Sequence, residues 1–206
     1  MAYILGDWEF YGLTLDICRD VLIPRPDTET LVERGLEFVK AQSGSVRVMD
    51  LCAGSGCVGL ALAANCPDSW VVLADWSEDA LRVCRQNIRR CGLSMQVSVA
   101  RVNALENAPA LLRDFDLIVC NPPYIPSDEI AGLDNSVRDY EPHMALDGGE
   151  DGLDFYRAIS ERWKVALRSG GKLIFEIGWD QAPAVEYILA AQGYRDIQTF
   201  QDPGGH

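Results

Sequence analysis

Four consecutive residues, Asn121-Pro122-Pro123-Tyr124, carry the groups needed to hold a planar nitrogen atom in place. The lone pair of an amide or aromatic amine nitrogen is delocalised, so this nitrogen attacks a methyl sulfonium only when the lone pair is aimed at the carbon. The side-chain oxygen of Asn121 and the carbonyl of Pro122 can each accept one N–H, which fixes the nitrogen and stabilises its developing positive charge. The prolines stiffen the turn and add no N–H, and Tyr124 can stack on the planar group. The alternative is a proline-rich turn that only ends a strand.

A glycine-rich loop lies N-terminal to this motif. Gly54, Gly56 and Gly59 spell G-x-G-x-x-G after an apolar run, and Asp75 lies 21 residues after Gly54. Glycines let the backbone turn sharply beside a ligand, and an acid at Asp75 can accept hydrogen bonds from both ribose hydroxyls. The pattern also fits a nicotinamide dinucleotide, or a tight turn with no ligand. Two details favour S-adenosylmethionine. Asp50 can orient the loop amides or contact the ammonium group of this ligand. S-adenosylmethionine also has no pyrophosphate, so it does not need the helix N-terminus that a dinucleotide uses.

Alternating apolar segments must bring the loop and the motif together. The predicted strands are 46–51, 70–74, 95–102, 115–120, 172–177 and 194–200. The first predicted helix is capped by Asp27 and Thr28 and ends near Ser43-Gly44, and another is capped by Ser77 and ended by Gly92. The other predicted helices are 58–64, 108–112, 153–167 and 182–192. Alternation predicts an α/β fold with a parallel sheet, whose ligands bind beyond the carboxyl ends of the strands. We expect residues 3–23 to form a hairpin or arm. Residues 121–151 are expected to form a long loop of functional importance.

Composition restricts the class of protein. The 206 residues are 48% hydrophobic and carry a formal net charge of -13, which suits a globular domain and disfavours nonspecific binding to nucleic acid. Seven cysteines without a C-x-x-C pair and two histidines predict reduced thiols in a cytoplasm and no metal site. No apolar stretch is long enough to cross a membrane. We also expect the chain to be a monomer.

Further stretches give the chain a family resemblance. They are Tyr3–Leu13, Val21–Glu29, the glycine loop, Asn121–Pro126, Val137–Pro142 and Ala145–Tyr156. With these stretches, which span nearly the whole chain, the sequence resembles the HemK/PrmC family. That family methylates the side-chain amide of glutamine in peptide-chain release factors.

The resemblance implies a class I S-adenosylmethionine-dependent methyltransferase fold, a Rossmann-like three-layer sandwich with a mostly parallel sheet. Residues 1–26 would form an N-terminal hairpin or arm, and residues 27–206 the methyltransferase domain. The implied reaction methylates the glutamine of a Gly-Gly-Gln loop in a release factor, serves translation termination and leaves S-adenosylhomocysteine. The implied catalytic residues are Asn121, Pro122 and Tyr124. The implied cofactor-binding residues are Asp50, Cys52, Ala53, Gly54, Ser55, Gly56, Asp75, Trp76, Asn103, Ala104 and Asn121. The implied substrate-binding residues are Asn121, Pro122, Pro123, Tyr124, Pro24 and Arg25.

The chain departs from the family pattern in three places. The family's N-terminal helical domain and its final antiparallel strand have no counterpart, so we expect a truncated chain whose sheet lacks one pairing. The chain also has Asn103 and Ala104 where the family has an acid followed by an aromatic beside the adenine. Asn103 could still meet the adenine amine, without an aromatic platform.

Other residues allow two interpretations. His143 could be a catalytic base or a surface residue, and we expect Glu176 to support the site structurally. Ion pairs of Arg138, Asp139 and Glu141 could order the long loop, or these residues could be solvated. Trp163 and Trp179 are expected to pack or to lie at a rim.

Two other functions use the same residues. An adenine-amine methyltransferase acting on DNA or RNA shares the Asn-Pro-Pro-Tyr logic but needs a basic groove and a pocket for a flipped base. An inactive cofactor-binding fragment is the second alternative.

Overall fold

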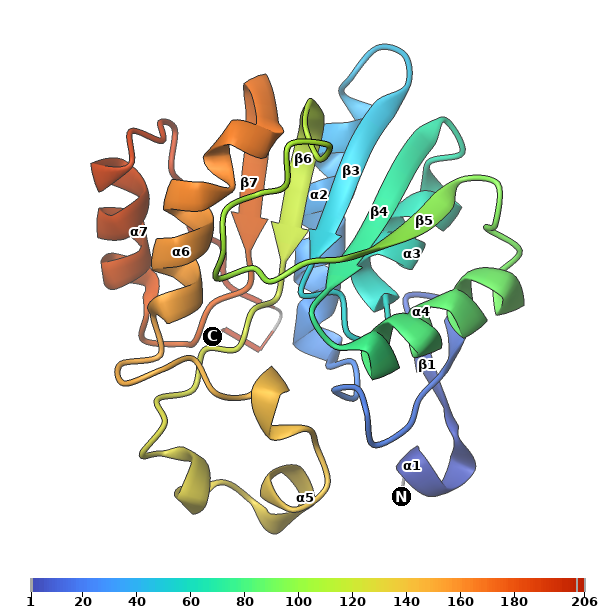
Figure 1. Ribbon diagram of the computed structural model, residues 1–206, viewed down its shortest axis with the longest axis vertical. Coiled ribbons are helices and arrows are strands. Elements are labelled where there is room, and N and C mark those ends of the chain that lie inside the picture. The colour runs from blue at the N-terminus through green and yellow to red at the C-terminus, as the bar shows by residue number, and fades with distance from the viewer. Residues whose placement is uncertain (1, 203, 206) are drawn as a thin grey trace.

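The computed structural model describes residues 2–202, 204 and 205. Its centre is a parallel sheet of β3 (Val46–Leu51), β4 (Ser69–Asp75), β5 (Val97–Arg101), β6 (Phe115–Cys120) and β7 (Leu167–Phe175) (Figure 1). The strand order is β5-β4-β3-β6-β7, so the direction in which successive strands are added reverses between β3 and β6. Ligands bind at such a switch point in α/β sheets. The glycine loop follows β3 and the Asn-Pro-Pro-Tyr motif follows β6, so both lie at this point.

Helices cover both faces of the sheet and make three layers (Figure 1). One face packs on α2 (Glu29–Lys40), α3 (Cys57–Asn65) and α4 (Glu78–Arg90), with a buried cluster that includes Leu36, Leu62, Cys84 and Leu117. The other face packs on α6 (Asp154–Arg162), with Met49, Ile118 and Ile159 in its cluster. Helix α7 (Ala182–Ala191) lies beside α6. Strand residues alternate between the two clusters, as a sheet that is buried on both faces requires.

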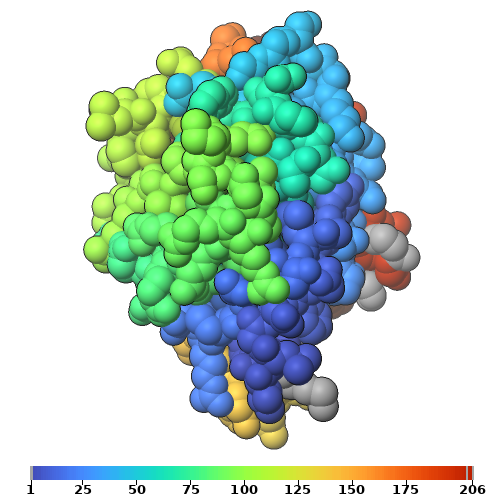
Figure 2. All heavy atoms as spheres, turned by 90° about the vertical axis from the view of Figure 1, so that its right-hand side faces the viewer, coloured from blue at the N-terminus to red at the C-terminus, as the bar shows by residue number. Residues whose placement is uncertain are grey.

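The N-terminal arm is a short helix α1 (Ala2–Leu5) followed by the hairpin β1 (Asp7–Phe10) and β2 (Leu13–Asp16). Figure 2 shows this dark-blue segment packed against the green segment that contains α4. Asn87, which is fully buried in α4, accepts a hydrogen bond from the Asp16 amide at 2.6 Å. Its Nδ2 donates to the carbonyls of Asp16 at 3.0 Å and Ser55 at 2.9 Å. One side chain therefore joins the arm to the glycine loop.

The long loop after β6 contains three short helical turns. They are Ile130–Gly132, α5 (Asn135–Arg138) and His143–Ala145. Two further 3-10 turns, Pro26–Thr28 and Lys164–Ala166, precede α2 and β7.

The α/β class, the parallel sheet and the hairpin are confirmed, and the bounds of the strands 46–51 and 115–120 agree with the sequence prediction. The predicted helix 108–112 is wrong. After Pro109 the backbone makes one turn, and the Arg113 guanidinium donates to the carbonyls of Ala108, Pro109 and Leu112 in place of helical N–H groups. The predicted helix 153–167 ends at Arg162, and β7 begins at Leu167 rather than at residue 172.

The predicted sixth strand, 194–200, is also wrong. Asp196 has a φ of 54°, which interrupts an extended backbone. Side chains hold the segment instead: Thr199 donates to Glu186, and the Arg34 guanidinium lies 5.0 Å from the centre of the Phe200 ring. Among the described residues, β7 pairs only with β6.

The domain division at residue 26 stays a prediction, and its end points Met1 and His206 lie outside the described residues. Among the described residues, no helix is long and apolar enough to span a membrane. The same part of the chain holds no group of three or more His, Cys, Asp and Glu side chains that could bind a metal ion. All seven cysteines are free thiols.

The substitution Asn87→Ala is expected to lower the free energy of unfolding by about 2–4 kcal/mol, because it leaves buried backbone groups of Asp16 and Ser55 without partners. Chemical denaturation measures the change. The control Asn65→Ala removes an exposed side chain that bonds only to its own helix, at Ala61, and should cost far less. Equal losses for the two variants would contradict the bridging role of Asn87.

Candidate active site

A cavity of about 460 Å³ opens beyond the carboxyl ends of β3, β4 and β6. This volume is within the range of small-ligand sites. The sequence-predicted residues that line it are Pro24, Asp50, Cys52, Ala53, Gly54, Ser55, Asp75, Trp76, Asn103, Ala104, Asn121 and Pro123. Gly56, Pro122, Tyr124 and Arg25 are not among its lining residues. The structure thus brings most of the predicted cofactor-binding residues, together with Asn121 and Pro123 of the acceptor motif, to one cavity.

Asp75 organises the turn between β4 and α4. One of its carboxylate oxygens accepts the Gly54 amide at 2.9 Å, and the other accepts the Ser77 amide at 2.8 Å. Burial raises the pKa of Asp75, while these backbone hydrogen bonds lower it. Each carboxylate oxygen can accept more than one hydrogen bond. Asp75 can therefore shape the glycine loop and still accept hydrogen bonds from a ligand in the cavity.

Asp50 acts from beneath the glycine loop. It is buried and accepts the Gly59 amide, which lies in the first turn of α3, at 2.8 Å. The predicted role of Asp50 in orienting the amides of the loop itself stays a prediction. Burial raises the pKa of Asp50 to about 8. A β-carbon at Gly59 would lie 2.3 Å from Leu73 and 3.0 Å from Asp50, so only glycine permits this approach. Gly56, with a φ of 81°, has the same purpose, since a β-carbon there would lie 2.7 Å from Leu73.

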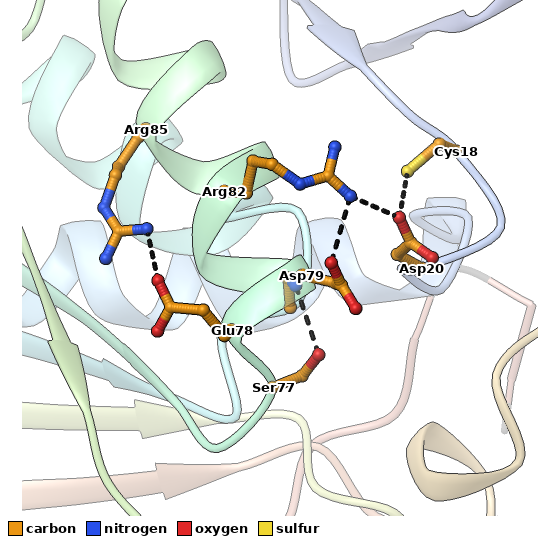
Figure 3. Close-up of polar contacts among 8 residues, drawn as sticks. Cys18, Asp20, Ser77, Glu78, Asp79, Arg82 and Arg85 are labelled. Carbon is orange, nitrogen blue, oxygen red and sulfur yellow. Dashed lines mark hydrogen bonds and ion pairs between the residues drawn. The ribbon is translucent and has the colours of Figure 1, made fainter.

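The start of α4 is held by polar contacts that reach the arm (Figure 3). The Ser77 hydroxyl accepts the Ala80 amide at 3.2 Å, which confirms its capping role. The Arg82 guanidinium donates to Asp79 at 3.2 Å and to Asp20 at 2.8 Å, as Figure 3 shows. Asp20 itself lines the cavity, so these ion pairs fix one of its walls.

The aromatic ring that lines this wall of the cavity belongs to Trp76, which follows β4, and not to a residue that follows β5. Trp76 lines the cavity and is 48% exposed, and the Arg101 guanidinium lies 4.7 Å from its ring centre. Asn103 also lines the cavity, but its Oδ1 accepts the Leu105 amide at 3.0 Å. Buried Trp163 donates to the Ala104 carbonyl at 3.0 Å and supports this wall, whereas Trp179 is exposed.

Asn121 leaves β6 with its side chain at the cavity. Its Nδ2 donates to the Thr28 hydroxyl at 3.3 Å. Thr28 is buried and lines the cavity, and its side chain makes no helix-capping hydrogen bond, contrary to the interpretation of this residue as a cap. Sequence reasoning missed its place in the site. In the sequence, Thr28 is marked by a hydroxyl-bearing side chain close after the Pro24-Arg25-Pro26 segment.

The Asn-Pro-Pro-Tyr turn is held from below by the glycine segment at 148–152. The Gly148 amide donates to the Ile125 carbonyl at 2.9 Å, and Gln181 Nε2 donates to the Tyr124 carbonyl at 2.9 Å. A β-carbon at Gly148 would lie 2.7 Å from the Tyr124 α-carbon, and one at Gly152 would lie 2.3 Å from the Tyr124 carbonyl oxygen. Burial raises the pKa of Tyr124 to about 12, so its phenol stays protonated at neutral pH.

Arg25 bonds to the long loop. Its guanidinium lies 2.5 Å from a carboxylate oxygen of Glu141, which is buried. This pair ties the loop beside Pro142 to the segment before α2. Arg138 and Asp139 form an exposed pair with each other. His143 lines the cavity with an exposed side chain, and its Nδ1 lies 3.9 Å from Asp147.

The comparisons with known proteins identify the family of the chain. The Methyltransferase small domain family matches residues 29–132. The release factor glutamine methyltransferase of Clostridium acetobutylicum is 44% identical over 202 residues, which cover 98% of this chain and 70% of the relative. The protein of the same name from Geobacter sulfurreducens is 42% identical, covering 100% of this chain and 70% of the relative.

Solved structures show the same fold at low identity. The catalytic domain of hMettl16 in complex with the MAT2A 3'UTR hairpin 6 matches with a TM-score of 0.72 and 18% identity, over 91% of this chain and 70% of that one. TrmN from Thermus thermophilus matches with a TM-score of 0.56 and 23% identity, over 77% of this chain and 40% of the TrmN chain. The sheet has the fold of class I methyltransferases. The curated relatives and the family model show that the chain, with its glycine loop and Asp75, is an S-adenosylmethionine-dependent methyltransferase and belongs to the release factor glutamine methyltransferase family.

Proposed function

We propose that this chain methylates the side-chain amide nitrogen of the glutamine in the Gly-Gly-Gln motif of peptide chain release factors. One observation carries the proposal: Asn121 lines the same cavity as the glycine loop and Asp75. An acceptor group for a planar nitrogen and a binding site for S-adenosylmethionine therefore share one space. The names of the curated relatives support the choice of a release factor glutamine as the acceptor.

The cavity residues fit S-adenosylmethionine, which supplies the transferable methyl group when bound. The Ser55 hydroxyl is buried at the cavity and has no hydrogen-bond partner among the described residues, so a ligand can use it. The proposed cofactor-binding residues are Asp50, Cys52, Ala53, Gly54, Ser55, Asp75, Trp76, Asn103, Ala104 and Asn121. Gly56 contributes by packing the loop on β4. Acidic groups near the cavity favour a cationic ligand.

The acceptor residues work by position and charge. Asn121 Nδ2 is committed to Thr28, which leaves the side-chain oxygen to accept one N–H of the glutamine amide. The Pro122 carbonyl accepts the other, so that both hydrogens are held while positive charge develops on the nitrogen. Pro123 closes the wall of the cavity. Tyr124, the next residue of the turn, would stack on the planar amide of the bound glutamine. Pro24 lines the cavity, while Arg25 shapes the entrance through Glu141.

The surroundings support a protein substrate over a nucleic acid. The net charge of -13 repels a phosphate backbone, and the likeness to a structure that contains RNA extends only to the fold. A cytoplasmic location, where release factors act and free thiols persist, fits both the proposed substrate and the seven free cysteines. We propose that the chain works as a monomer.

A transfer assay with labelled S-adenosylmethionine separates the functions. We expect label in a release factor, none in a release factor whose motif glutamine is replaced, and none in DNA or RNA. Label only in nucleic acid would support the adenine-amine alternative. Binding of S-adenosylmethionine without transfer to any acceptor would support the inactive fragment.

The substitution Asn121→Ala removes one of the two acceptors and should lower the transfer rate by about 10²–10³-fold. Calorimetry with S-adenosylmethionine should show a much smaller loss of affinity than of rate, because Asn121 is one of many proposed cofactor contacts and the glycine loop and Asp75 remain. Asn107→Ala, at an exposed asparagine outside the cavity, is the control. A normal transfer rate in Asn121→Ala would remove Asn121 from the mechanism.

The substitution Gly148→Ala should displace the turn that carries Pro122 and Tyr124, because its β-carbon meets backbone atoms at 2.7 Å and 2.9 Å. A displacement of this size is expected to lower kcat/KM for the release factor by about 10–10²-fold. Gly132→Ala is the matched control, since no atom lies within 4 Å of its added β-carbon. Equal kinetics for the two variants would show that the 148–152 segment does not position the turn.

A further inference from the structure

The carboxamide of Asn121 has two polar side chains from distant parts of the chain beside it, the buried Thr28 and the partly buried Glu176. Thr28 reaches it from the turn before α2 and accepts its Nδ2 hydrogen at 3.3 Å. Glu176 reaches it from the end of β7. In the parallel pair of β6 and β7, Cys120 is aligned with Phe175, and the Glu176 amide donates to the Cys120 carbonyl at 3.0 Å. Glu176 therefore lies beside Asn121 at the sheet edge that faces the cavity.

The Glu176 carboxyl is held in an environment that is costly for its charge. Burial raises its pKa to about 7, although side-chain hydrogen bonds with Thr28 and Asn121 lower it. Its Oε2 is buried without a hydrogen-bond partner among the described residues. Tyr156 donates to the Glu176 carbonyl at 3.1 Å, which fixes the backbone there. A buried carboxyl with an unused oxygen destabilises a fold, so its presence beside Asn121 calls for a function.

An ionised carboxylate accepts hydrogen bonds and donates none, and this property sets the direction of the whole contact. The single hydroxyl proton of Thr28 goes to Glu176, so the Thr28 oxygen is left to accept. Asn121 must then present its NH2 group to both neighbours. Because the carboxamide is planar, its oxygen is turned to the opposite side, where a glutamine N–H needs an acceptor.

We propose that Thr28 and Glu176 are positioning residues that fix the Asn121 carboxamide with its oxygen toward the methyl acceptor. This role rests on the proposed function. In it, Thr28 and Glu176 select one of the two orientations of the Asn121 carboxamide. An Asn121 rotated by 180° would place its NH2 group against the glutamine N–H, donor against donor. The transfer rate therefore depends on residues that touch neither the acceptor nitrogen nor the methyl group.

Protonation of Glu176 reverses the contact. The protonated carboxyl can donate to the Thr28 oxygen, which frees the Thr28 hydroxyl to donate and allows Asn121 to present its oxygen inward. The working form is therefore the ionised one, present above pH 7 and lost as pH falls through about 7. Two charges near Glu176 adjust this point: Arg25 lowers its pKa and Asp27 raises it. Its other ionisable neighbours, Tyr124, Tyr156 and Cys57, have raised pKa values and stay neutral in this range.

The substitution Thr28→Val keeps the shape of the side chain and removes the hydroxyl. We expect kcat/KM for the release factor to fall by about tenfold, with unchanged affinity for S-adenosylmethionine. Thr28→Ser restores the hydroxyl and should recover most of the activity. Thr28→Val should also move the acid limb of the pH profile to higher pH, because the hydrogen bond that it removes lowers the pKa of Glu176.

The substitution Glu176→Gln replaces a group that only accepts with one that can also donate. The acid limb near pH 7 should disappear, and kcat/KM should be reduced at every pH, since both orientations of Asn121 become populated. The chain offers a matched control in the exposed pair of Thr199 and Glu186, whose hydrogen bond of 2.6 Å lies outside the cavity. Thr199→Val and Glu186→Gln should keep the wild-type rate and pH profile.

Wild-type kinetics and an unchanged acid limb in Thr28→Val and Glu176→Gln would overturn the positioning role while leaving the proposed function intact. A fall in Thr28→Val that Thr28→Ser does not reverse would also overturn it, since packing rather than the hydroxyl would then be the cause. If Glu176→Gln fails to fold, the two Thr28 variants decide alone. A wild-type chain that methylates no release factor would contradict the proposed function itself.

Discussion

The parallel pairing of β3 with β6 is the contact on which the site depends. The two strands are aligned so that Leu51 lies opposite Cys120, which places the residues that follow them, Cys52 and Asn121, at the same edge of the sheet. The glycine loop and the Asn-Pro-Pro-Tyr turn are thereby brought together from segments 69 residues apart in the sequence. A slip of one residue in this register would turn the Asn121 side chain to the other face. The burial of every residue in β6 prevents such a slip, because it would expose or overcrowd two packed layers.

Three carboxyl groups, one buried and two partly buried, set the electrostatic character around the cavity. Burial raises the pKa of Asp50, Asp75 and Glu176. A protein keeps such groups only where hydrogen bonds or a positively charged ligand offset the loss of hydration. The Gly54 and Ser77 amides satisfy Asp75 in part, and the Gly59 amide in the first turn of α3 satisfies Asp50 in part, so both carboxyl groups help to fix the backbone around the cavity. Glu176 keeps one buried oxygen without a hydrogen-bond partner among the described residues, and it lies beside the acceptor motif.

Local patterns in the sequence were enough to predict the strands before the two motifs. The runs 46–51 and 115–120 are mostly apolar, and a glycine or a proline follows each within three residues, so their bounds were predictable. The segment 194–200 contains β-branched and aromatic residues but forms no strand, because strand formation also requires a partner and a permissive backbone at Asp196. Most of the candidate site residues follow strand ends and were predictable for the same reason. Thr28 and the Arg25–Glu141 pair were not, since their partners are set by tertiary packing over long separations.

The bridge made by Asn87 has a consequence for the order in which the molecule can be assembled. The hairpin is synthesised early, but the side chain that receives it comes 71 residues later in the chain. The same amide also holds the Ser55 carbonyl, so the ligand loop cannot reach its final shape on the ribosome until α4 has emerged. Until that moment the hairpin presents Leu15, buried in the finished protein, to solvent or to a chaperone. Completion of the cofactor pocket and burial of the N-terminal arm therefore both require the same side chain of α4.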